Sequence, residues 1–262
     1  MAGRSTRLSV GARSETGYVR DENQDRMTRV GAPFGDVYIV SDGMGGHKGG
    51  AVAAELTTEI LGRTLSDIRS ISSAPAQVKA AFEEANKVVY ERGHSGDEGI
   101  RDMGATAVVL LIDQSQAIVA HVGDSRAYLF MQGELRRLTK DHSRVQRMVD
   151  AGILTEAQAA SHPASNLLER AVGVAPDIQT DISPPFKLNA GDLFLLCSDG
   201  LHGYVSDSEI AGILNRRTAV QTMVDELVDL ALEKGGEDNI TVQLVGYDYS
   251  GGGTQTPIAG LI

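Results

Sequence analysis

The chain has 262 residues and a formal net charge of −11 at pH 7, from 24 Lys and Arg against 35 Asp and Glu. This length suits one large domain, and the acidic balance argues against nucleic acid as the main partner. The single cysteine, Cys197, excludes an internal disulfide and fits a reducing compartment. No apolar run approaches the roughly 20 residues of a membrane span, and the first residues lack a signal peptide's apolar segment, so we expect a cytoplasmic protein.

Apolar periodicity predicts strands and helices in the first half of the chain. In order, the expected elements are strands at 8–13, 27–30 and 36–40, helices at 51–65 and 77–92, and strands at 106–113, 117–122, 127–131 and 134–138. Short strands at short spacing favour antiparallel pairing. Two amphipathic helices in succession should cover one face of a sheet.

The second half begins with short helical pieces over 143–161, which we interpret as an insert standing on a sheet. The expected elements after it are strands at 178–183 and 192–197, a helix from Ser206 to Asn215, a second helix from Thr218 to Gly235, and a strand at 240–247. Ser206 with Glu209 three residues later is a capping-box signal, and Thr218 is a candidate cap for the next helix.

These elements predict an α+β fold in four αββα layers. Two central antiparallel β-sheets are each flanked by a pair of helices. We expect one domain over residues 1–248. Residues 249–262 are rich in glycine and lack periodicity, which predicts a flexible tail.

Aspartates at the ends of predicted strands form the candidate site. Asp42 and Asp199 each follow an apolar run, and each lies between a serine and a glycine. Further aspartates lie in turns at Asp25, Asp124 and Asp238. Any one of them alone is explained by turn chemistry. The five together favour an oxygen-lined site for hard divalent cations, because carboxylates that repel one another are stabilised by bound cations.

Six motifs in order resemble those of bacterial metal-dependent serine/threonine protein phosphatases of the PPM family (type 2C). They cover nearly the whole chain, from about 8 to 245, and are Arg20-Asp21-Glu22-Asn23-Gln24-Asp25, Ser41-Asp42-Gly43-Met44-Gly45-Gly46, Gly104-Ala105-Thr106-Ala107, His121-Val122-Gly123-Asp124-Ser125-Arg126, Ser198-Asp199-Gly200-Leu201 and Asp238-Asn239-Ile240-Thr241. The resemblance implies the same αββα sandwich, and it implies that the insert, at about 143–166, is a small helical flap beside the active site that helps to choose substrates.

The resemblance also implies a set of metal ligands for two Mn²⁺ or Mg²⁺ ions. In that set Asp42 bridges both ions, Asp199 and Asp238 complete one ion, and Asp25 and the carbonyl of Gly43 serve the other. A possible third ion is implied at Asp124 with Asp199. Some relatives carry another aspartate four residues after the position of Asp199, where this chain has Gly203.

The implied reaction is direct attack on phosphorus by a hydroxide bridging the metals, with no phosphoenzyme. Arg20 is the expected phosphate ligand, and a surface ion pair with Asp21 or Glu22 is the alternative. Animal relatives commonly have a histidine where this chain has Met44, so His47 is a candidate general acid, with a metal-bound water as the alternative.

The other histidines have simpler interpretations. His121 lies in an apolar strand and is expected to be a core histidine, while His142 and His162, at the edges of the insert, are expected to be structural. Zinc is disfavoured, because neither the histidines nor Cys197 have ligand spacing.

The expected function is hydrolysis of phosphoserine and phosphothreonine in proteins, opposing bacterial serine/threonine kinases, with those kinases among the substrates and no nucleic acid or membrane partner. We expect a monomer. The main alternative is a catalytically silent module with the same fold, which the intact aspartates and Arg20 argue against. A generic Ca²⁺-binding protein is the other alternative, but the chain has no twelve-residue calcium loop.

Overall fold

A computed structural model describes residues 8–45, 48–160 and 162–248. The expected tail at 249–262 and the candidate general acid His47 lie outside the described residues. None of the helices in the described ranges combines the length and the apolar character that crossing a membrane requires.

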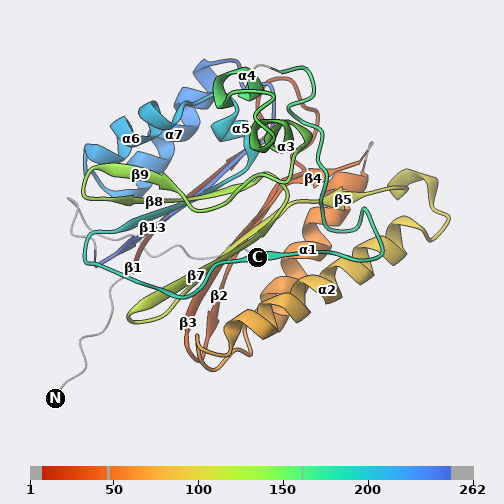
Figure 1. The fold of residues 1–262 in the computed structure, drawn as a ribbon, viewed down its shortest axis with the longest axis horizontal. Coiled ribbons are helices and arrows are strands. Elements are labelled where there is room, and N and C mark those ends of the chain that lie inside the picture. Colours follow the sequence, from red (N-terminus) through yellow and green to blue (C-terminus); the bar gives the residue numbers. More distant parts are fainter. Residues whose placement is uncertain (1–7, 46–47, 161, 249–262) are drawn as a thin grey trace.

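The first large sheet has five antiparallel strands (Figure 1). Their order across the sheet is β1 (Leu8–Glu15), β13 (Ile240–Tyr247), β12 (Leu193–Cys197), β8 (Arg126–Met131) and β9 (Glu134–Arg137). The first and last strands of the described chain are therefore neighbours, with Leu8 opposite Tyr247.

The second large sheet is also antiparallel and lies against the first. Its order is β10 (Asp181–Ile182), β7 (Gln116–Val122), β6 (Ala107–Ile112), β3 (Gly35–Ser41) and β2 (Arg26–Ala32), with β11 (Phe186–Lys187) also paired to β7. A separate two-stranded ribbon joins β4 (Gly43–Met44) to β5 (Gly104–Ala105).

Helices cover the outer face of each sheet, which gives the four layers seen in Figure 1. The helices α1 (Gly49–Leu65) and α2 (Ala74–Gly93) pack on the second sheet, and α6 (Asp207–Asn215) and α7 (Val220–Glu233) pack on the first. The expected αββα sandwich with antiparallel sheets is confirmed.

Three apolar layers separate the four structural layers, because successive side chains of a strand point to opposite faces. In β3, Val37 and Ile39 belong to the cluster shared with α1 and α2, whereas Tyr38 and Val40 belong to the cluster between the sheets. All four side chains are fully buried, which makes β3 a central strand.

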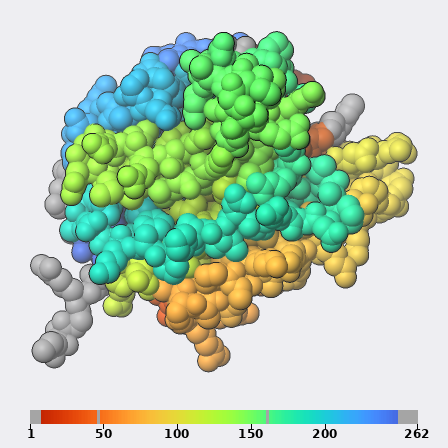
Figure 2. Space-filling model, in the orientation of Figure 1, coloured from red at the N-terminus to blue at the C-terminus, as the bar shows by residue number. Residues whose placement is uncertain are grey.

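The insert consists of two short helices, α3 (Arg144–Asp150) and α4 (Glu156–Ala160). It lies beside the α6 and α7 layer, and the segment after it crosses the face of the molecule shown in Figures 1 and 2. That segment is fixed to α2 by Asn86, which donates to the carbonyls of Ala175 and Pro176 and accepts from the amide of Gly173.

Several local predictions differ from the structure. The strand expected at 178–183 is paired only at Asp181–Ile182, and the second short strand β11 follows Pro184 and Pro185, which have no N–H to donate to a ladder. The residues after Ser198 form a short helix, α5 (Asp199–His202), and a short 3₁₀ helix, η1 (Glu98–Ile100), lies in the expected loop.

The two predicted caps of the last helices have different outcomes. The capping box at Ser206 is present: the Ser206 hydroxyl accepts from the amide of Glu209, and the Glu209 carboxylate accepts from the amide of Ser206. The cap predicted at Thr218 is wrong, because α7 begins after Ala219, which has no side-chain cap.

We predict that Ser206→Ala lowers the free energy of unfolding by about 0.5–2 kcal/mol, because the amide of Glu209 loses its side-chain acceptor. Urea denaturation measures the change. Ser73→Ala is a matched control, since Ser73 is also an N-cap residue but makes no side-chain cap bond. Equal decreases in the free energy of unfolding of the two variants would contradict a stabilising role for the capping box.

Candidate metal centre

Strand register brings the five aspartates to one end of the sandwich. In the second sheet Arg26 pairs with Ser41, so the neighbouring residues Asp25 and Asp42 lie at the same end. In the first sheet Cys197 pairs with both Arg126 and Val242, so the turns that carry Asp124, Asp199 and Asp238 also share an end.

Asp42 is fixed through its backbone by Thr106. The amide of Asp42 donates to the Thr106 hydroxyl at 2.9 Å, and its carbonyl accepts from the Thr106 amide at 2.8 Å. The Thr106 hydroxyl is also 2.6 Å from the hydroxyl of Ser125, the residue after Asp124. The Gly-Ala-Thr motif therefore connects the turns that carry Asp42 and Asp124.

Asp25 is buried, and it joins the two sheets. Its Oδ2 accepts from the hydroxyl of Ser198 at 2.7 Å, while the Ser198 hydroxyl accepts from the amide of Thr241. Its Oδ1 is buried without a hydrogen-bond partner.

Asp238 is paired with Arg20. The guanidinium donates from Nη2 to Oδ2 of Asp238 at 2.8 Å, and this pair replaces the alternative ion pairs with Asp21 or Glu22. Next to it, Asn239 accepts from the amide of Gln24 and donates to the carbonyls of two other residues in the loop that precedes β2. Asn239 therefore holds the loop that carries Arg20.

The backbone of Asp124 is fixed by His202, a histidine that the sequence did not indicate. The carbonyl of Asp124 accepts from Nε2 of His202 in α5 at 2.9 Å. The pKa of His202 is lowered to about 3 by burial and then by Arg126, which favours the neutral ring. No spacing rule pointed to this contact, because α5 was not expected.

Gly43 allows a close approach that other residues would block. A Cβ on Gly43 would lie 2.0 Å from the carbonyl oxygen of Gly50, in the first turn of α1. The bare backbone therefore packs the β4 turn directly against the helix and presents the Gly43 carbonyl beside Asp42.

A cavity of about 360 Å³ lies among these residues and is lined by Asp42, Gly43, Asp124, Asp199 and Asp238, with Arg20 at its edge. Asp25 repels the carboxylate of Asp42 electrostatically, and this repulsion contributes to the raised pKa of Asp42.

Burial and mutual repulsion favour protonation of the carboxylates. Burial, then Asp25, Asp199 and Asp124, raises the pKa of Asp42 well above its usual value. Burial and nearby carboxylates also raise the pKa values of Asp124 and Asp199, and they raise the pKa of Asp25 to about 7. Bound cations relieve this repulsion and favour the ionised forms.

The donor set fits hard divalent cations. All the candidate ligands are oxygens, and the buried Oδ1 atoms of Asp25 and Asp199 have no hydrogen-bond partner. Among the described residues, no three of these carboxylates have oxygens within 4.8 Å of one another. The carboxylates thus surround a cavity instead of closing on one point.

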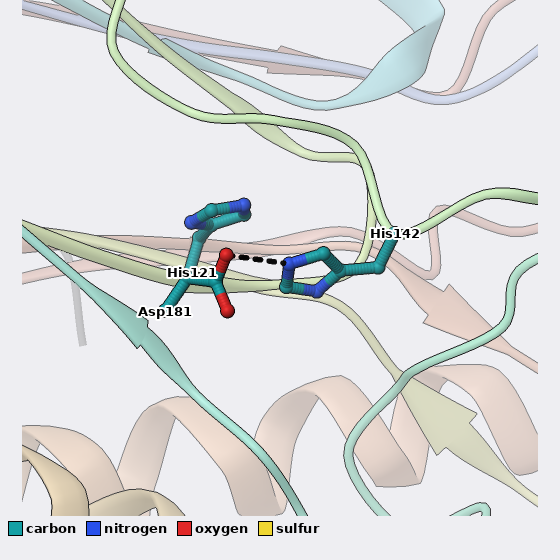
Figure 3. A group of neighbouring side chains, drawn as sticks. All are labelled: His121, His142 and Asp181. Carbon is teal, nitrogen blue, oxygen red and sulfur yellow. Dashed lines mark ion pairs between the residues drawn. The ribbon is translucent and has the colours of Figure 1, made fainter. Parts of the chain in front are cut away.

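A second cluster joins His121, His142 and Asp181, whose ligand atoms do lie within 4.8 Å of one another (Figure 3). The two rings stack with centroids 4.5 Å apart. Nδ1 of His142 accepts from the amide of Gly123, so the proton of the neutral ring is on Nε2, which faces Asp181 at 3.4 Å. That nitrogen has no lone pair for a metal, and the cluster instead supports the turn before Asp124.

The remaining predicted histidines have local roles or lie outside the described ranges. His121 bonds the carbonyl of Lys140 through Nε2, and His162 accepts from the amide of Ala164 through Nδ1. His47 lies outside the described residues.

Arg126 of the fourth motif has a structural partner that the motif did not reveal. It donates to both oxygens of Asp141, at 3.0 and 2.7 Å. Although burial alone would raise the pKa of Asp141, these bonds lower it. The pair fixes β8 to the segment that enters the insert.

The chain matches the family model "Protein phosphatase 2C" over residues 18–244. It is 36% identical over 241 residues to protein phosphatase PhpP of Streptococcus pneumoniae, covering 91% of this chain and 97% of that protein. The structure of the S. agalactiae serine/threonine phosphatase is similar with a TM-score of 0.86 and 34% identity, covering 92% of this chain and 99% of that one. A similar catalytic domain, of the phosphatase PstP in complex with 2 manganese ions, has a TM-score of 0.81 and 33% identity, covering 93% and 99% of the two chains.

We predict that acid removes the stability that neutral His142 contributes. Burial, then His121, lowers the pKa of His142 to about 4 in the fold, against about 6.5 in the unfolded chain. Between these values the unfolded state binds more protons, so the contribution is complete above pH 6.5 and declines as the pH falls to 4.

Urea denaturation of the wild type and His142→Gln tests this prediction. The stability advantage of the wild type should shrink by about 2–3 kcal/mol between pH 7 and pH 4. Titration of Asp25, Asp42 and Asp199 contributes to both proteins and cancels in the difference, because His142 is not among the causes of their shifts. A difference that does not depend on pH would be inconsistent with a neutral, buried His142.

Proposed function

The chain belongs to the protein phosphatase 2C family and is a metal-dependent serine/threonine protein phosphatase; from this premise we propose which of its residues hold the metal and the phosphate. The observation that carries the proposal is the group of buried and half-buried, mutually repelling aspartates around one cavity, which Arg20 also lines.

Two Mn²⁺ or Mg²⁺ ions are proposed to bind there. Asp42 would contribute to both ions, Asp199 and Asp238 would complete the protein ligands of one, and Asp25 with the Gly43 carbonyl would complete those of the other. Support comes from the all-oxygen donor set and from the two buried oxygens that have no other partner.

A third ion is proposed between Asp124 and Asp199. Support comes from the repulsion that both side chains experience within the same cavity. Position 203, where some relatives supply a further carboxylate, is a glycine whose amide closes α5 by bonding to the Asp199 carbonyl.

When bound, such cations lower the pKa of water and neutralise phosphate oxygens, which supplies both a nucleophile and charge stabilisation for ester hydrolysis. The protein's own contribution is positional. Thr106 and Ser198 hold Asp42 and Asp25 at fixed places, so the carboxylates need little rearrangement before reaction.

Arg20 is proposed to bind the substrate phosphate. Its guanidinium already bonds a carboxylate oxygen at the edge of the cavity, and a planar fork can bind two oxygens of a phosphate group in the same way. Asn239 supports this role by fixing the loop on which Arg20 lies.

The leaving serine or threonine oxygen needs a proton, and His47 is proposed as its donor from the sequence alone.

Phosphoproteins, including serine/threonine kinases, are the proposed partners of a monomer in the cytoplasm. The segment 143–166 is proposed as the flap, with residues 1–248 as the catalytic domain. A catalytically silent module is the weaker alternative, because all the proposed ligands are present.

We predict that Asp199→Asn lowers kcat for a phosphothreonine peptide by roughly 10²-fold or more, because a cation ligand is lost. Calorimetry should also show weaker Mn²⁺ binding. Asp177→Asn, an exposed change in the segment after the insert, serves as control. Chelation should abolish wild-type activity and Mn²⁺ should restore it. Full turnover in chelator would contradict the metal proposal, and Mn²⁺ binding without any turnover would favour the silent module.

We predict that Arg20→Ala raises KM for the phosphopeptide about tenfold and leaves kcat within a few-fold, because phosphate binding is weakened before the chemical step. Steady-state kinetics separate the two constants. Arg63→Ala is the control, since Arg63 also pairs with a carboxylate, Glu84, but on the helical face. A collapsed kcat with unchanged KM would be evidence against phosphate binding by Arg20.

A further inference from the structure

A groove much larger than the aspartate cavity opens next to it. Its volume is about 930 Å³, and its walls are the loop at residues 19–24 on one side and residues 97–100, around η1, on the other. The groove and the aspartate cavity share Arg20, Gln24, Gly45 and Asn239 as lining residues. The two spaces are therefore continuous at the proposed phosphate ligand.

A protein substrate needs such a surface. The aspartate cavity, at about 360 Å³, has room for a phosphate and the side chain that carries it, but the polypeptide on either side must lie outside. The groove is at the upper end of the range, about 300–1,000 Å³, that holds drug-sized ligands, so it can take more than one flanking side chain.

The groove is predominantly acidic. Asp21, Glu22 and Asp97 line it together with the cations Arg20 and Lys48, and Arg20 is already bonded to Asp238. Asp97 has Arg92 3.7 Å away and accepts from the amide of Gly99. Two carboxylates, Asp21 and Glu22, therefore remain in the groove against one cation, Lys48.

Asp21 and Glu22 differ from Asp97, the other carboxylate of the groove, in having no ion pair with a described residue. Both are exposed. Nearby, Val19 is 66% exposed and Ile100 forms part of the opposite wall. Lys and Arg side chains suit this combination, because their methylene stems cover apolar surface while their charged ends reach carboxylates.

We propose that this groove binds the residues flanking the phosphorylated serine or threonine and selects substrates with a Lys or Arg that reaches Asp21 and Glu22. The proposal rests on the proposed function, since it assigns the substrate preference of the same site. The preference arises largely from exposed charges, so it is modest and weakens as salt is raised.

The test compares phosphothreonine peptides that are identical except for Arg or Glu at each of the flanking positions. For the wild type we expect kcat/KM to favour the best Arg peptide over its Glu counterpart about five- to tenfold. In Asp21→Asn/Glu22→Gln the ratio should fall below about twofold, and in Asp21→Lys/Glu22→Lys it should invert. Because both peptides are measured with the same enzyme, a mutational change in the rate of the chemical step affects both kcat/KM values equally and does not alter their ratio.

The matched control is Glu59→Gln/Asp67→Asn, which changes the net charge equally at exposed positions in and after α1. It should keep the wild-type ratio. Equal ratios in this control and in Asp21→Asn/Glu22→Gln, or a wild type that does not distinguish the peptides, would overturn the groove proposal.

Two further measurements separate this proposal from the proposed function. Hydrolysis of p-nitrophenyl phosphate by the wild type reports catalysis without a flanking chain, so its absence counts against the proposed function only. Fluorescence anisotropy with non-hydrolysable phosphonate versions of the Arg and Glu peptides measures the preference in Kd without turnover. The wild type should bind the Arg peptide more tightly than the Glu peptide, and Asp21→Asn/Glu22→Gln should lose this preference. Equal Kd values of the wild type for the two peptides would overturn the groove proposal.

Discussion

Repulsion among buried carboxylates is the constraint on which the rest of the site depends. Asp25 is buried, Asp42 and Asp199 are half-buried in the cavity wall, and they repel one another, so their ionised forms are costly unless positive charge is supplied. Without a bound cation, the chain supplies part of that charge itself through Arg20. The same arrangement that destabilises the ionised carboxylates suits the hard divalent cations that we propose to bind there.

The two-sheet architecture maintains this arrangement. Each sheet contributes aspartates at one end, and the hydrogen bond from Ser198 to Asp25 crosses from one sheet to the other. Thr106 then connects the backbone of Asp42 with Ser125, beside Asp124. Hydroxyl side chains perform these tasks because they donate to a carboxylate or accept from an amide without adding charge to a crowded site.

The long elements agree with the sequence prediction for a physical reason, and four of the five predicted aspartates line one cavity. Helices such as α1 and strands such as β3 bury one or both faces, so their apolar patterns are strong. The capping box is also a local signal, because Ser206 and Glu209 lie within four residues of one another. The short strands β10 and β11 depend on pairing with the distant β7, which local pattern does not encode. The contacts of Arg20 with Asp238, and of His202 with Asp124, join residues far apart in the chain and required the structure.

The pairing of the first described strand with the last has a consequence for protein engineering. Leu8 lies opposite Tyr247, while the other end of the same ladder, Glu15 opposite Ile240, adjoins the aspartate turns. Strands of this length span roughly 25 Å, so a domain or affinity tag joined directly to Leu8 or Tyr247 meets the ladder at its end remote from the cavity. A short linker from 247 to 8 can close the chain, and the exposed β8–β9 turn at Gln132-Gly133 then offers a place to open a circular permutant.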